Sequence, residues 1–449
     1  MSGSLVDLPK TPLARESLAH DLRGFAEFGQ ATRCTITRAG TFAGDELEIP
    51  TFINEFWTPQ QRAANRLHEI SYRACFKPQL PRFFIQRLTQ PGEIVYDPFM
   101  GRGTTLIEAA LLGRVPFGCD INPLSAVLTR PRLLPPLLSA IEKRLRSLNL
   151  TSDPDPLSGD AANPLTPPRE DLLVFFHPQT LDQIVRLKNY FLRQRDSLDT
   201  IDDWIRMVAI NRLTGHSAGF FSVYTLPPNQ AISAKAQRKI NADRNQTPSP
   251  RDIVEIILKK SRSLLSEIFP ATRSRDELSI SGTDPFESWC GPLENIHQRA
   301  LLLTQEASNT RQIPDAAVSL VVTSPPFLDV VDYAGDNWLR CWFLGIDPKS
   351  VRLTVPKKLA DWQKAMTAVF RELHRLLKPG GHIAFEVGEV HGGKTKLEET
   401  VLPCGLEAGL TAELILINDQ EFTKTANCWG VDNNAKGTNT NRIVVFRKA

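Results

Sequence analysis

A short strand–turn–helix pattern at residues 93–112 constrains the fold of this chain more than any other feature. The apolar run 93–96 is followed by the string DPFMGRGTT (Asp97–Thr105), and an amphipathic run comes next. The two glycines of the string allow the backbone to turn sharply and to approach a ligand where a Cβ atom would clash. A glycine turn between a strand and a helix N-terminus is typical of nucleotide-like ligand sites in α/β sheets.

A rhythm of strands and helices surrounds this pattern and returns later in the chain. Apolar runs predict strands at 94–96, 115–120, 300–304, 319–322 and 382–387. Amphipathic runs predict helices at 60–70, 83–88, 104–112 and 359–377, with a glycine turn at 379–381. The runs 413–417 and 442–446 are expected to close the sheet as antiparallel strands. The chain is therefore predicted to have a Rossmann-like α/β fold with a doubly wound parallel sheet.

This rhythm is interrupted by a long segment of mainly helical character. Helical patterns occur there at 136–147, 179–195, 200–213 and 251–268, separated by breaks rich in Pro, Ser and Asp. We predict three parts of the chain: an N-terminal extension packed on the core, an α/β domain and a large helical insertion. Their predicted boundaries are 1–54 for the extension, 55–123 with 296–449 for the α/β domain, and 124–295 for the insertion.

Composition excludes several classes of protein. The net charge of +3 means that any surface for a polyanion must be local. The seven cysteines include no Cys-x-x-Cys pair, and the eight histidines show no ligand spacing, which predicts reduced thiols and no metal site. No apolar run approaches the length of a bilayer, so we expect a cytoplasmic protein without a membrane partner. No pattern predicts an oligomeric state.

The glycine turn carries an acidic residue that limits its ligand. Asp97 lies at the end of a predicted strand and can accept hydrogen bonds from an ammonium or ribose group, and Asp120 ends the next strand. A dinucleotide turn reads G-x-G-x-x-G, but here the third glycine is missing. A carboxylate would repel a pyrophosphate and suits a ligand with an amino-acid tail, which predicts S-adenosylmethionine as cofactor. The alternative is a glycine turn of any Rossmann-like domain, with Asp97 capping the helix.

A second string, TSPPF (Thr323–Phe327), follows the buried run 318–322. Its two prolines, Pro325 and Pro326, fix the backbone and leave rigid carbonyls. Such carbonyls can accept hydrogen bonds from an aromatic amine and direct its lone pair at a methyl donor, while Phe327 offers a face for base stacking. The Ser324 hydroxyl is both donor and acceptor, which suits cytosine with its ring acceptor N3 beside the N4 amine. The alternative is a structural turn with a core phenylalanine.

Together the two strings resemble the amino-methyltransferases of DNA, specifically the N4-cytosine type of restriction–modification systems. That family has a D-P-F-x-G-x-G-T-T donor loop and a T-S-P-P-Y/F catalytic loop, and the resemblance extends to 73–81, 376–382 and 437–442. It implies methylation of a cytosine flipped out of double-stranded DNA in the prokaryotic cytosol or nucleoid. It also makes a cognate restriction endonuclease, acting separately, a potential partner. Phe327 replaces the commoner Tyr and keeps the stacking face.

The resemblance also assigns residues to roles. The catalytic residues that it implies are Ser324, Pro325, Pro326 and Phe327. The cofactor-binding residues that it implies are Phe76, Lys77, Pro78, Asp97, Pro98, Phe99, Gly101, Gly103, Thr104, Thr105, Asp120, Ile121 and Glu306. Asp120 falls on the position that binds the ribose. Glu306 falls near the position that contacts the cofactor's adenine, where the family more often has Asp.

DNA recognition is predicted to lie in the insertion, because the sheet needs most of the residues that follow Phe327. Between Thr225 and Leu264 there are eight basic residues (235, 238, 239, 244, 251, 259, 260, 262) and three acidic ones (243, 252, 255). The residues that we predict to bind DNA are Lys235, Arg238, Lys239 and Arg244, and Gln246 has a side chain able to bridge base edges. The alternative is an ordinary solvated basic helix.

Two other functions remain open from the sequence. The same fold can methylate the N6 amine of adenine in DNA or a base in RNA. The chain can also be a catalytically silent module that binds nucleic acid, although both loops are intact.

Overall fold

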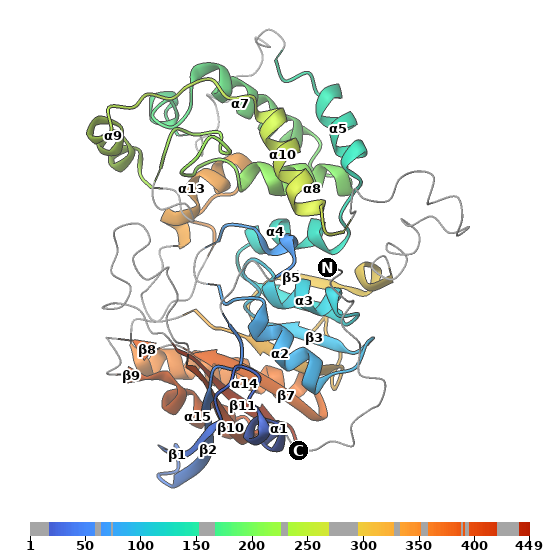
Figure 1. Ribbon diagram of the computed structural model, residues 1–449, viewed down its shortest axis with the longest axis vertical. Helices are drawn as coiled ribbons and strands as arrows, with labels where there is room; N and C mark the ends of the chain where they lie inside the picture. Colours follow the sequence, from blue (N-terminus) through green and yellow to red (C-terminus); the bar gives the residue numbers. More distant parts are fainter. Residues whose placement is uncertain are drawn as a thin grey trace.

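The computed structural model describes most of the chain in two parts, an α/β part and a helical part that lies beside one edge of it (Figure 1). The described residues are 18–58, 64–72, 75–151, 167–225, 232–268, 295–326, 333–351, 358–387, 389–390, 395–419 and 440–449. Within them, no helix is long and apolar enough to cross a membrane.

A nine-stranded sheet forms the α/β part, with the order β1-β2-β10-β11-β7-β6-β3-β4-β5. Strands β3 to β7 are parallel to one another, whereas β11 is antiparallel to both β7 and β10. The chain runs from β3 outward to β4 and β5, and from β6 outward to β7, so the strand order reverses between β3 and β6. The strands are β1 (Arg33–Gly40), β2 (Glu46–Asn54), β3 (Ile94–Asp97), β4 (Val115–Asp120), β5 (Leu301–Thr304), β6 (Val318–Thr323), β7 (Leu377–Val387), β10 (Thr411–Asp419) and β11 (Thr440–Arg447). A separate short pair consists of β8 (Glu389–Val390) and β9 (Thr395–Lys396).

Helices cover both faces of this sheet, which is why its central strands are apolar on both sides. Val95 of β3 packs against the face that α1 (Leu18–Gly24), α2 (Gln79–Leu88) and α3 (Thr104–Leu111) cover. The next residue, Tyr96, packs against the opposite face with α14 (Leu359–Leu376) and α15 (Leu397–Glu407). The predicted doubly wound Rossmann-like sheet is therefore confirmed.

The helical part, called the helical lobe below, has one continuous apolar core. Its helices are α4 (Leu124–Leu133), α5 (Leu138–Ser147), α6 (Arg169–Leu172), α7 (Pro178–Arg193), α8 (Thr200–Ile210), α9 (Ala234–Asp243), α10 (Ile253–Leu265) and α13 (Tyr333–Leu344). The four helices predicted in the insertion are present as α5, α7, α8 and α10. Helix α13 was not predicted, and it joins this lobe because Leu339, Trp342 and Phe343 are buried in its core. The lobe therefore includes a segment from outside the predicted 124–295 insertion.

Three local predictions were wrong. Residues 33–54, expected in an extension, form a hairpin whose strand β2 pairs in parallel with β10 and so belongs to the sheet. The helix expected at 60–70 is only a 3₁₀ turn, Arg66–His68, within the described residues 64–72. The turn expected at 379–381 lies inside β7, where the register with β6 shifts and Gly380 has a φ of 75°. The hairpin was missed because β1 is almost wholly exposed and lacks a buried alternation.

Candidate active site

Asp97 ends β3 at the point where the strand order reverses, which is where open α/β sheets bind ligands. Its carboxylate is 1% exposed. Oδ1 accepts hydrogen bonds from the Phe99 backbone N–H at 3.0 Å and from the Thr323 hydroxyl at 2.6 Å. Burial raises the pKa of Asp97 to about 7 although both hydrogen bonds lower it. A cationic group of a ligand would stabilise the ionised carboxylate here.

Asp120 ends the neighbouring strand β4 and is held by two backbone groups. Its Oδ2 accepts from the Gly101 N–H at 2.8 Å, and its Oδ1 accepts from the Asn122 N–H at 2.8 Å. Burial raises the pKa of Asp120. Each carboxylate oxygen has a second lone pair, so this fixed group can still accept hydrogen bonds from ligand hydroxyls.

Two structural features explain why the donor loop has glycine at positions 101 and 103. Gly101 has a φ of 49° and Gly103 a φ of 77°, in the left-handed region that glycine adopts without cost. A Cβ atom on Gly103 would also lie 2.3 Å from the Thr129 hydroxyl oxygen of α4, so the loop packs closely on that helix. The loop is therefore a rigid turn that presents its backbone beside the two carboxylates.

These features fit S-adenosylmethionine, which carries an ammonium group and ribose hydroxyls. Asp97 would supply a buried anion for the cation, and Asp120 would supply acceptors for the hydroxyls. When bound, the cofactor supplies an electrophilic methyl group on its sulfonium.

The other predicted cofactor residues surround the same loop. Pro98, Phe99, Thr104, Thr105 and Ile121 lie on the turn or directly after β3 and β4. The Thr105 hydroxyl donates to the Val322 carbonyl at 3.0 Å, and the Thr104 hydroxyl accepts from Arg102 at 3.1 Å, so both threonines also stabilise the protein itself.

Two predicted groups lie at the margins of this region. Phe76, Lys77 and Pro78 precede α2, and burial together with the charge of Arg102 lowers the pKa of Lys77. Glu306 is exposed just after β5, the strand that pairs with β4.

The acceptor string begins where β6 ends, directly beside Asp97. Ser324 is half-buried, Pro325 is buried, and the Pro326 carbonyl accepts a hydrogen bond from the Trp362 indole N–H of α14 at 3.1 Å. Phe327 lies outside the described residues. The hydrogen bond between Thr323 and Asp97 brings the start of the acceptor string against the donor loop, 226 residues away in sequence.

Glu386 is a candidate site residue that the sequence reasoning missed. It is buried on β7, which pairs with β6, and its side chain is hydrogen-bonded to Ser324. The Asn441 side-chain amide donates to Glu386 at 2.6 Å. Burial raises the pKa of this carboxyl against both hydrogen bonds. Its position near the carboxyl end of the strand beside β6 was the signal that could have identified it.

The predicted DNA-binding residues are only partly brought together. Lys235, Arg238 and Lys239 are exposed on α9, but Arg238 forms an ion pair with Asp171. Arg244 stacks with its guanidinium 3.9 Å from the centre of the Tyr224 ring.

Other side chains of this basic segment serve the protein itself. The Gln246 side chain donates to the Tyr224 carbonyl at 3.0 Å, so it anchors the segment after α9. Lys260 of α10 pairs with Glu69 at 2.9 Å. Three of the eight basic residues therefore lie on α9, and Arg238 and Lys260 are engaged in ion pairs with other parts of the chain.

The first part of the α/β fold matches a known family. The family model for N6/N4 methyltransferases, described as DNA methylase, matches residues 45–126, which include β2, the donor loop and Asp120. The type II methyltransferase M.BsoBI of Geobacillus stearothermophilus is 24% identical over 333 residues, 68% of this chain and 58% of that protein. The type II methyltransferase M.MvaI of Kocuria varians is 41% identical over 81 residues, 17% of this chain and 18% of that protein. This chain thus covers less than two thirds of either relative.

The similarity of this chain to solved structures is weaker than its similarity to these relatives. A putative DNA modification methylase from Thermus thermophilus, complexed with S-adenosyl-L-methionine, is 23% identical, with a TM-score of 0.19 over 31% of this chain and 50% of that chain. The family match over residues 45–126 and the type II relatives support an N4/N6 DNA methyltransferase that has a Rossmann-like fold and uses S-adenosylmethionine as cofactor.

Proposed function

We propose that this chain is a DNA methyltransferase that transfers a methyl group from S-adenosylmethionine to the N4 amine of a flipped cytosine within a specific DNA sequence. The observation that carries the proposal is the 2.6 Å hydrogen bond between Thr323 and Asp97. It joins the acceptor string to the donor carboxylate at the point where the strand order reverses. A methyl donor held by Asp97 would therefore lie beside an amine held by Ser324 and Pro325.

The acceptor residues can hold such an amine and receive its proton. The carbonyls of the Ser-Pro-Pro string can accept hydrogen bonds from the amine and so direct its lone pair. Ser324 is hydrogen-bonded to Glu386, whose raised pKa makes its carboxylate a stronger base than that of an exposed glutamate. A proton released at N4 can pass through Ser324 Oγ to Glu386.

Support for cytosine comes from the TSPPF string, which matches the N4-cytosine pattern. Adenine also presents a ring acceptor beside its exocyclic amine, so the alternative of N6-adenine methylation needs a direct test. A base inside a duplex cannot reach a buried site, which supports base flipping. The proposal includes a role beside a cognate restriction endonuclease, which the likeness to type II methyltransferases supports.

The test is methyl transfer to each class of nucleic acid. The purified chain is incubated with S-adenosylmethionine carrying a tritiated methyl group and with either duplex DNA or structured RNA, and the products are digested to nucleosides. We expect N4-methylcytosine from DNA. N6-methyladenine alone would overturn the choice of base, and label confined to RNA would overturn DNA as the substrate.

The variant Ser324→Ala distinguishes a catalytically active enzyme from a module that only binds nucleic acid. Ser324→Ala is expected to lower the rate of transfer at least about a hundredfold while cofactor affinity stays near the wild-type value. Ser350→Ala is the matched control, because Ser350 is exposed and its hydroxyl donates to the nearby Asp347 carbonyl. Equal activity of the two variants would contradict the role of Ser324.

A further inference from the structure

The segment that precedes α2, called the strap below, lies against the donor loop, and its described residues lack regular structure apart from one 3₁₀ turn. Its described residues are 64–72 and 75–78. Buried backbone carbonyls need donors, and here arginine side chains from three other segments supply them. Arg102 of the donor loop donates to the Ile70 carbonyl at 2.9 Å, and Arg132 of α4 donates to the Leu67 carbonyl at 3.0 Å. The third arginine, Arg340, comes from α13.

Arg340 is buried and divides its guanidinium between three partners. Nη2 donates to the Ser71 carbonyl of the strap at 2.8 Å, and Nε donates to the Ile210 carbonyl at the end of α8 at 3.4 Å. Nη1 donates to Asn337 on its own helix at 2.8 Å. A planar fork with several N–H groups suits such divided bonding, which an ammonium cannot reproduce. Arg340 therefore joins the helical lobe, the strap and the helix that comes next after the acceptor string.

The residue after Ser71 continues this connection to the donor site. The Arg340 guanidinium lies 5.9 Å from the centre of the Tyr72 ring. The Tyr72 hydroxyl accepts a hydrogen bond from the Asn122 side chain at 3.3 Å. The backbone N–H of Asn122 in turn donates to Asp120, the carboxylate proposed for the ribose. A continuous set of contacts thus leads from α13 to Asp120.

We propose that Arg340 and Tyr72 are positioning residues that hold the donor carboxylate Asp120 in place from the helix following the acceptor string. The inference rests on the proposed function for its substrates, but its first readout is cofactor binding alone. Neither side chain needs to contact the reacting atoms. Because α13 belongs to the core of the helical lobe, the lobe stabilises the cofactor site as well as offering a surface for DNA.

Cofactor affinity of single variants tests the proposal. Tyr72→Phe keeps the ring and removes the oxygen that accepts from Asn122, and the dissociation constant for S-adenosylmethionine is expected to rise about fivefold. Arg340→Met removes all three hydrogen bonds, and a rise of about twentyfold is expected, with Arg340→Lys in between. Isothermal titration calorimetry of the whole chain without DNA measures these constants. Steady-state assays should then show a larger rise in KM for the cofactor than fall in kcat.

Matched controls separate positioning from loss of stability. Arg114 is equally buried and donates to the Thr89 and Leu112 carbonyls at the opposite edge of the sheet. Arg114→Met is expected to lower the melting temperature like Arg340→Met but to leave cofactor affinity unchanged. Tyr190→Phe, which removes a hydroxyl inside the helical lobe, is the control for Tyr72→Phe.

Two outcomes would overturn the inference. One is wild-type cofactor affinity in folded Arg340→Met and Tyr72→Phe variants, and the other is an equal loss of affinity in the two controls. Wild-type protein that binds the cofactor but transfers no methyl group to nucleic acid would contradict the proposed function alone, because the calorimetric comparison does not depend on transfer.

Discussion

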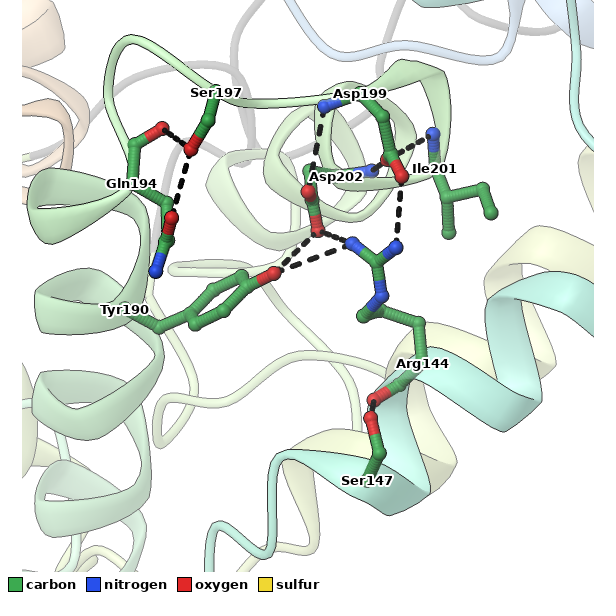
Figure 2. A network of polar contacts seen from close by, with 8 residues as sticks. All are labelled: Arg144, Ser147, Tyr190, Gln194, Ser197, Asp199, Ile201 and Asp202. Carbon is green, nitrogen blue, oxygen red and sulfur yellow. Dashed lines mark hydrogen bonds and ion pairs between the residues drawn. The ribbon is translucent and has the colours of Figure 1, made fainter.

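The carboxyl edge of the sheet and the helical lobe use their charged side chains in different ways. At the sheet edge, the buried Asp97 and the half-buried Asp120 accept hydrogen bonds from backbone N–H groups and from one hydroxyl. In the lobe, Asp199, the N-cap of α8, and Asp202 of α8 share the guanidinium of Arg144 from α5 (Figure 2). Removing one partner of a buried charge pair destabilises a protein, whereas carboxylates held by neutral donors remain ready to bind a cation.

The largest expected effect tests the first half of this comparison. Asp97→Asn removes the buried negative charge and keeps an oxygen for the Phe99 N–H. We expect S-adenosylmethionine to bind at least about a hundredfold more weakly, because a cation would then face a neutral amide. Calorimetry measures this loss. Asp21→Asn, at an exposed position on α1, is the control, and equal affinities of the two variants would contradict the assignment of Asp97.

The second-largest expected effect is a loss of stability when a charge pair of the lobe is broken. Figure 2 shows Arg144 pointing at Asp199, Asp202 and the Tyr190 hydroxyl, which donates to Asp202 at 3.0 Å. Arg144→Met leaves Asp202 buried without its cation and is expected to lower the free energy of unfolding by about 2 kcal/mol, roughly a thirtyfold change in the folding equilibrium. Thermal unfolding measures this change.

The control for the lobe lies on the same helix. Arg146 pairs with Glu142 and Glu255 on the surface, so Arg146→Met should change stability by less than about 0.5 kcal/mol. Cofactor affinity at temperatures where the Arg144→Met variant is folded should equal that of the wild type. A large loss of cofactor affinity in Arg144→Met would contradict the distinction between stabilising charge pairs in the lobe and ligand-binding carboxylates at the sheet edge.

The sequence predicted the parts of the site whose elements are adjacent in the chain or lie at the ends of parallel strands. The donor loop was predicted because its strand, glycine turn and helix are adjacent in the chain, and strand ends in a parallel sheet meet at one edge. The hydrogen bond from Thr323 to Asp97 follows from that rule once both strands are recognised. Glu386 follows the same rule, because it lies near the carboxyl end of the predicted strand β7, which pairs with β6.

Other features depended on tertiary packing that no local pattern carries. Helix α13 joins the lobe through Trp342 and Phe343, which pack against residues far away in sequence. The sequence predicted a helix at 60–70. In the strap, however, backbone carbonyls accept hydrogen bonds from Arg102, Arg132 and Arg340 of distant segments. The ion pair of Arg238 with Asp171 also joins distant segments and cannot be predicted from the spacing of the basic residues.

A third, smaller effect concerns the pH dependence of cofactor binding. Burial raises the pKa of Asp97 to about 7, so the free protein increasingly carries this carboxyl in its neutral form as the pH falls below 7. Because a cationic ligand requires the ionised form, the dissociation constant for the cofactor should rise about tenfold per pH unit below 7. The raised pKa also means that the stability of the free protein falls as the pH rises from about 4 to about 7. Calorimetry between about pH 5.5 and about pH 8.5 tests the binding, and Asp97→Asn should abolish most of the dependence.

The smallest expected effect concerns the part of the lobe proposed to face DNA. Lys235 and Lys239 are exposed on α9, at the outer side of the lobe in Figure 1. The double variant Lys235→Ala/Lys239→Ala should weaken duplex binding about fivefold and lower the slope of log affinity against log salt by about 2, since each phosphate contact contributes about 0.9. Lys143→Ala/Lys364→Ala removes the same charge from α5 and α14 and should leave the slope unchanged. Arg238→Ala should have less effect than either lysine because Asp171 already neutralises that guanidinium. Equal slopes for the two double variants would contradict the proposal that Lys235 and Lys239 contact DNA.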